Sequence, residues 1–80
     1  MTNQEREIRA FMTNLGFSHI QTGGGCTAYA KHNGDGTETL ITDGDLGAPE
    51  SLSDSCVMSR VHEGGEIVSE EAFESVRKIA

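Results

Sequence analysis

The segment CTAYAKHNGDGTETLITD, residues 26–43, constrains the fold of this chain more than any other. Cys26–His32 alternates small residues with larger ones, and Thr37–Asp43 is rich in β-branched residues, so both are typical of β-strands. The NGDG turn between them indicates a hairpin, because Asn and Gly tolerate positive φ. Strands joined by so short a turn must be antiparallel, since a parallel crossover needs about a dozen residues.

Two more strands are predicted on either side of this hairpin. Phe17–Thr22 leads through three glycines, residues 23–25, into Cys26. Cys56–His62 forms a fourth strand and is followed by the turn sequence EGGE. Ile67 and Val68 then add at most a brief edge strand.

An amphipathic helix is predicted before the first strand. Thr2 or Asn3 can cap its start, and Gly16 follows where a left-handed residue ends a helix. Its apolar residues recur at i, i+3, i+4 and i+7, on one helical face: Ile8, Phe11, Met12 and Leu15.

A second helix is predicted at the C-terminus. Ser69 is the expected N-cap, and Glu70 and Glu71 then occupy the first turn, where the helix dipole favours acidic side chains. Arg77 and Lys78 suit the negative end of the same dipole.

The order of these elements predicts a single α+β domain over residues 1–80. We expect a twisted antiparallel sheet of three to four strands, with the N-terminal and C-terminal helices on one face and an exposed, polar opposite face. Tyr29 is expected on the face away from the helices. The small residues of the second strand are expected to face the helices: Cys26, Ala28 and Ala30.

The glycine run before Cys26 invites a chemical interpretation, which its context disfavours. A phosphate-binding loop reads GxxxxGK[ST] and opens a helix, whereas here no Lys follows and a strand is predicted. A nucleophilic Cys needs a base within hydrogen-bond reach, and none of the three His lies in a recognisable catalytic context. We therefore predict a turn, no catalytic residue and no enzyme activity.

A metal site is disfavoured by spacing. Cys26 and His32 are six residues apart, and so are Cys56 and His62. Six residues of extended strand span about 20 Å, so one strand cannot supply both ligands to one ion. We expect no metal and no cofactor, although a cross-strand pair of Cys26 with Cys56 stays open as an alternative.

The charge distribution carries most of the functional information. The formal net charge is −7, and residues 32–76 contain eleven acidic residues and a single basic one, Arg60. Such a surface disfavours direct binding to nucleic acid or to an anionic membrane and favours a basic partner. No apolar run approaches the ~20 residues of a membrane span, and with two cysteines and no signal peptide we expect a cytoplasmic location.

In size, α+β pattern and acidity the chain resembles the small phage-encoded anti-CRISPR proteins. The resemblance is one of type, carried by the acidic middle NGDGTETLITDGDLGAPESLSD, residues 33–54, and by LGFSHIQTGGGCTAY, residues 15–29. It implies a protein of the bacterial host's cytoplasm that binds a Cas effector complex and blocks its DNA-binding groove, without catalysis or a cofactor.

The partner-binding residues predicted on this hypothesis are acidic residues of the turns and strands. A phage structural or accessory protein that uses its sheet face, including as a homodimer, is an alternative function, and a thiol or zinc protein using Cys26 and Cys56 is another. The predicted contacts are Asp35, Glu38, Asp43, Asp45 and Asp54, with Glu63 and Glu66 as a second cluster.

Overall fold

The computed structural model describes residues 3–43, 47–62 and 64–79, and all structural statements refer to these. They form an α-helix, five strands and a short 3₁₀ helix. The elements are α1 (Asn3–Asn14), β1 (Ser18–Gly23), β2 (Cys26–His32), β3 (Thr37–Thr42), β4 (Cys56–His62), β5 (Ile67–Phe73) and η1 (Val76–Ile79).

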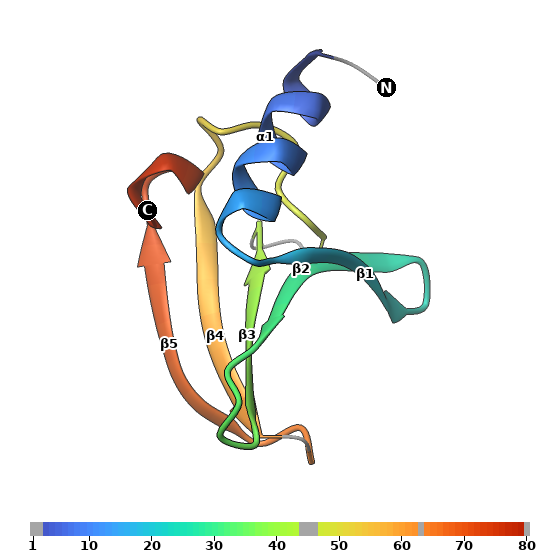
Figure 1. Cartoon of the computed structure of the whole chain (residues 1–80), viewed down its shortest axis with the longest axis vertical. Helices are drawn as coiled ribbons and strands as arrows, with labels where there is room; N and C mark the ends of the chain where they lie inside the picture. The colour runs from blue at the N-terminus through green and yellow to red at the C-terminus, as the bar shows by residue number, and fades with distance from the viewer. Residues whose placement is uncertain (1–2, 44–46, 63, 80) are drawn as a thin grey trace.

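The strands form one antiparallel sheet in the order β1-β2-β3-β4-β5, so every strand pairs with its neighbours in sequence. The β1–β2 hairpin runs across the direction of β3 to β5, which gives the sheet a strong twist (Figure 1). The predicted α+β class and antiparallel pairing are confirmed, and β2 and β4 have the predicted bounds. The predicted number of strands, three to four, is wrong, because the sheet has five.

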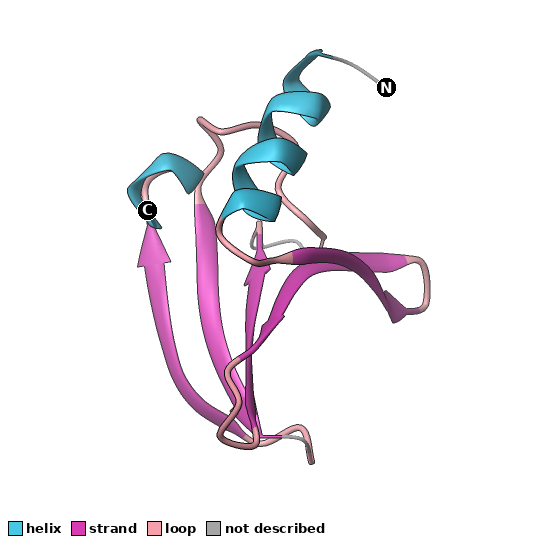
Figure 2. Ribbon diagram, viewed as in Figure 1, coloured by secondary structure: helices cyan, strands magenta, loops and turns pink. Residues whose placement is uncertain are grey.

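The helix α1 lies over one face of the sheet, which we call the inner face; the opposite face is the outer face (Figure 2). Ile8 and Met12 of α1 are buried against Ile41 of β3 and Val76 of η1, as the helical periodicity predicts. Gly16 ends the helix region with φ +92°, and the amide of Phe17 donates a hydrogen bond to the Met12 carbonyl at 2.9 Å. The left-handed residue predicted at Gly16 is therefore confirmed.

The predicted C-terminal helix is wrong over most of its length. Ser69 to Phe73 continue β5, where Ser69 pairs with Arg60 and Glu71 with Met58. Only the four residues of η1 are helical, on the same side as α1, since Val76 joins the core of that face. The edge of β4 offers backbone hydrogen-bonding groups to the whole of this segment. A helix of the predicted length has marginal stability unless an apolar face packs against the rest of the protein.

The predicted orientation of β2 is also wrong. Tyr29, only 3% exposed, lies on the inner face in the core, beside Ile41 in the adjacent strand. Ala28 pairs with Ile20 and lies on the outer face with the other small residues of β2. The reversal places the large aromatic ring in the thin core with the α1 side chains, while Ala28 is fully buried on the outer face.

The outer face differs from the polar surface that we predict from sequence. No helix of the described residues covers it, yet polar groups such as Glu38 and Ser59 alternate there with aliphatic ones. Its half-buried aliphatic residues are Ile20, Leu40, Val57 and Val61.

The glycine run is a turn, as predicted. Gly24 and Gly25 have φ of +60° and +82° between β1 and β2, and an added Cβ would meet nothing within 4 Å at either position. The positive φ values explain why glycine occupies both positions. In the described residues, no helix is long and apolar enough to cross a membrane.

Candidate functional site

The inner face carries a polar hydrogen-bond network beyond the end that α1 covers. Asn33 donates from its side-chain amide to the hydroxyls of Thr37 and Thr39, at 3.1 and 3.0 Å. Asp35 accepts hydrogen bonds from both the backbone amide of Thr37, at 3.0 Å, and its hydroxyl. These bonds fix the β2–β3 turn, the hairpin that the NGDG sequence predicts.

The carboxylate of Asp35, one of the predicted contacts, therefore has part of its hydrogen-bonding capacity used within the turn. The two hydrogen bonds from Thr37 hold the pKa of its carboxyl below the ordinary value, and the Arg60 guanidinium adds to the shift. Arg60 Nη2 lies 3.5 Å from Asp35 Oδ2, and both side chains are about half exposed. A pair with this exposure contributes little to folding stability.

Two other predicted contacts, Asp43 and Asp54, also accept hydrogen bonds from backbone amides. Asp43 accepts a hydrogen bond from the amide of Gly47 at 3.2 Å. Asp54 accepts from the amides of Glu50 and Ser51 at 3.0 and 3.2 Å. Both carboxylates thus bind backbone amides within residues 47–51.

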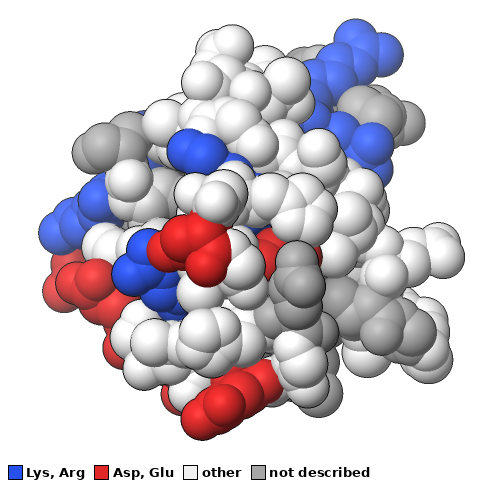
Figure 3. All heavy atoms as spheres, turned by 60° about the horizontal axis from the view of Figure 1, so that its bottom comes forward, with Lys and Arg blue, Asp and Glu red and all other residues white. Residues whose placement is uncertain are grey.

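The predicted contacts fall at two ends of the sheet rather than on one patch. Asp35 and Glu66 lie in the β2–β3 and β4–β5 turns, which are at the same end (Figure 1). Asp43 and Asp54 lie at the other end of β3, and a six-residue strand is about 20 Å long. The view from the turns shows acidic side chains in separate groups (Figure 3). Asp45 and Glu63 lie outside the described residues.

Glu38 is the one predicted contact within a strand. Its carboxylate lies 3.5 Å from the imidazole Nδ1 of His32 on β2. The two residues are cross-strand neighbours on the outer face.

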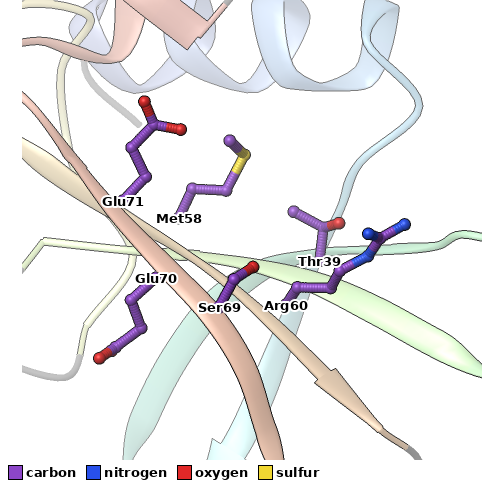
Figure 4. A pocket seen from close by; sticks show the side chains of 6 residues that line it. All are labelled: Thr39, Met58, Arg60, Ser69, Glu70 and Glu71. Atoms are coloured by element: carbon purple, nitrogen blue, oxygen red, sulfur yellow. The ribbon is translucent and has the colours of Figure 1, made fainter.

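The acidic residues that sequence reasoning assigned to a helix are on the β5 edge. Glu70 and Glu71 are both exposed, and their side chains point to opposite faces of the sheet (Figure 4). Among the described residues, no Lys or Arg forms an ion pair with them or with Glu66. The available signal was the EGGE turn after β4, since a tight turn after a seven-residue strand predicts a partner strand of similar length.

A hollow of about 370 Å³ lies beside β5 on the inner face. Met58 and Glu71 project toward α1, and Arg60 projects from the same face farther along β4 (Figure 4). The hollow thus has an apolar side chain, Met58, together with basic and acidic side chains in its lining. It is lined by Thr39, Met58, Arg60, Ser69, Glu70 and Glu71.

A smaller hollow of about 180 Å³ lies between α1, the β1–β2 hairpin and the loop after β3. His19 and Tyr29 line it, with their rings edge to face and centroids 5.3 Å apart. Burial and the nearby Arg9 lower the pKa of His19, and burial raises the pKa of Tyr29. Both shifts favour the neutral forms of the rings, which suits packing.

The two cysteines lie on different faces. Cys56 is buried in the core of the inner face, whereas Cys26 is half-buried on the outer face. Both thiols are free, and burial raises the pKa of the Cys56 thiol, which disfavours the nucleophilic thiolate. Within the described ranges, no group of three or more His, Cys, Asp or Glu residues is arranged to hold a metal ion.

Comparison with known proteins finds no matching family model, curated protein or solved structure.

Proposed function

We propose that this protein is a non-enzymatic acidic binding protein that blocks a basic, nucleic-acid-binding protein surface in a bacterial cytoplasm. The observation that supports this function best is the set of exposed carboxylates on and beside β5. Glu66, Glu70 and Glu71 have no ion pair with Lys or Arg among the described residues, and the hydrogen bond from Ser59 to Glu70 is long, at 3.4 Å. Their negative charge is therefore available to a partner.

The position of these carboxylates suits a surface that normally holds a phosphate backbone. Glu70 and Glu71 present one negative charge on each face of the β5 edge, and Glu66 adds another in the turn before it. This acidic edge would attract the Lys and Arg side chains of a nucleic-acid groove and compete with DNA for them. The partner we propose is a Cas effector complex, and the protein acts as a phage-encoded inhibitor of it.

Binding to purified Cas effector complexes, loaded with guide RNA, tests this function. We expect a complex that excludes target DNA and weakens strongly between about 0.1 and 0.5 M salt, because screening shortens the reach of the charges. A complex that admits DNA normally, or binding to none of the effectors, would contradict the inhibitor function. A complex indifferent to salt would contradict the charge mechanism.

The double variant Glu70→Gln/Glu71→Gln tests which carboxylates matter. A matched control is Glu7→Gln/Glu50→Gln, which removes the same charge from exposed positions on α1 and in the β3–β4 connection. We expect weaker binding for the β5 variant and near-normal binding for the control. Equal losses in both variants would mean that only the net charge is sensed.

A second candidate function is supported by the outer face. Leu40, Val57 and Val61 lie half-buried there, and no helix of the described residues covers them. A virion structural or accessory protein that docks through this face, or a homodimer formed through it, would bury them. Leu40→Glu would then abolish assembly, whereas a charge-driven inhibitor would tolerate it.

A further inference from the structure

β5 is the last strand of the sheet and has a free edge. It pairs with β4 on one side, and in the described residues no segment pairs with its other side. Six of its seven residues are exposed, including the aliphatic side chains of Ile67 and Val68, which are 57% and 50% exposed. An exposed edge of this kind presents backbone N–H and C=O groups that an added strand can pair with.

Edge strands are usually protected by charged side chains, proline or a bulge. β5 contains no lysine or proline; its register shifts between Ile67 and Ser69, and Ser69 to Phe73 then pair regularly with β4. Its carboxylates guard this regular part against pairing with strands that lack a complementary charge. The charged residues within this strand are Glu70 and Glu71 alone. The edge is therefore open to a strand whose charge is opposite to theirs.

The charge of the edge argues against a second copy as the occupant. Antiparallel pairing of two β5 strands about their centres would bring Glu70 and Glu71 of one copy beside the same residues of the other. Like charges placed opposite each other destabilise a strand pair. The β1 edge, by contrast, has the sequence SHIQTG without an acidic residue, so it offers no such selection by charge.

We propose that the free edge of β5 binds an extended, basic segment of the partner protein by strand addition. In such a strand, successive side chains point to alternate faces. One basic side chain would lie over Met58 in the 370 Å³ hollow and reach Glu71 on the inner face. The next would reach Glu70 on the outer face. Arg60 lies farther along β4, and its guanidinium is already near Asp35.

This inference rests on the proposed function, because it specifies how the acidic surface engages a basic partner. The two can fail separately. A Cas effector that binds the protein with no effect of the β5 variants would leave the inhibitor function in place and overturn strand addition.

The test uses a short synthetic β-prone peptide with two adjacent lysines at its centre and the isotope-labelled full-length protein. Backbone amide shifts in NMR titrations should change along β5 and leave β1 unchanged. The same peptide with alternate amides N-methylated keeps its charge but loses the hydrogen-bond donors of one edge. We expect its affinity to fall at least about tenfold, the effect of roughly 1.4 kcal/mol.

Three protein and peptide controls complete the design. Glu70→Gln/Glu71→Gln should weaken the peptide complex by about tenfold, because two opposite-charge cross-strand contacts are lost. Glu7→Gln/Glu50→Gln should change it less than about twofold, and a peptide with glutamates in place of its lysines should not bind. Equal affinity for the methylated and unmodified lysine peptides, shift changes away from β5, or binding of neither would overturn the proposal. A concentration-dependent dimer through β5 would also overturn it by making a second copy the occupant.

Discussion

The two ends of the inner face differ in polarity, although every second residue of the strands faces inward at both ends. On β3, Thr37, Thr39 and Ile41 all face inward. Ile41 lies beneath α1 and is fully buried, whereas the two threonines belong to the polar network with Asn33. α1 has 12 residues and is about 18 Å long, so it cannot cover the whole face. Apolar burial is therefore concentrated at the covered end, and the open end is held by polar hydrogen bonds.

The sharpest test of this contrast is removal of a core side chain at the covered end. Ile41→Ala should lower the free energy of unfolding by about 2–5 kcal/mol, measured by urea denaturation followed by circular dichroism. A domain of this size has only about 3–5 kcal/mol from its core, so the variant should be largely unfolded. Leu40→Ala, the matched control on the half-buried outer face, should cost less than half as much. Equal losses would contradict a one-sided core.

The two cysteines provide a second comparison between the faces. Cys56→Ser places a hydroxyl in the apolar core at a position that is 2% exposed, and should cost about 1–3 kcal/mol of unfolding free energy. Cys26→Ser changes a half-buried outer position and should cost under about 1 kcal/mol. Thermal unfolding of both variants under reducing conditions makes the comparison. A larger loss of unfolding free energy for Cys26→Ser would mean that the core lies on the outer face of the sheet.

Much of this fold was predictable because its signals are local. The periodicity of Ile8 and Met12, the left-handed Gly16 and the NGDG turn each depend on a few neighbouring residues. The C-terminal segment was not, because Ser69 to Phe73 reads as a helix start on its own and becomes a strand only through pairing with β4. The inward orientation of the Tyr29 side chain likewise depends on which face of β2 packs against α1.

The candidate site was less predictable than the fold. An acidic surplus can be counted in the sequence, but the hydrogen bonds that occupy Asp43 and Asp54 depend on the conformation of the β3–β4 connection. The exposed positions of Glu70 and Glu71 at a free edge can be inferred only when β5 is known to be a strand. Composition thus predicts the sign of the partner's charge, and register determines where the charge is presented.

The stability of the open end should depend on pH through Asp35. The pKa of Asp35 is lowered in the folded protein, so its carboxylate adds stability that is present above its ordinary pKa of 3.8 and is lost as pH falls through the lower, folded value. Asp35→Ala should therefore lower the urea midpoint modestly at pH 7, and the difference from the wild type should shrink below pH 3.8. Glu66→Ala, which removes an exposed carboxylate at the same end of the sheet, is the control for the change in net charge. A difference for Asp35→Ala that stays constant across this range would mean that its carboxylate charge does not stabilise the turn.

The smallest effect on stability is expected at the β5 edge, where the proposed binding effect is largest. Glu70→Gln/Glu71→Gln removes two exposed charges that have no ion pair with Lys or Arg in the described residues. The free energy of unfolding should change by less than about 0.5 kcal/mol, and any gain would come from reduced repulsion between neighbouring carboxylates. Urea denaturation beside the wild type measures it. A loss above about 1 kcal/mol would mean that these carboxylates hold β5 in place, and weaker partner binding by the variant would then reflect a damaged edge rather than lost charge. Unchanged stability with weakened binding would assign the two glutamates to recognition, because groups that contribute nothing to the fold can affect a complex only through the partner.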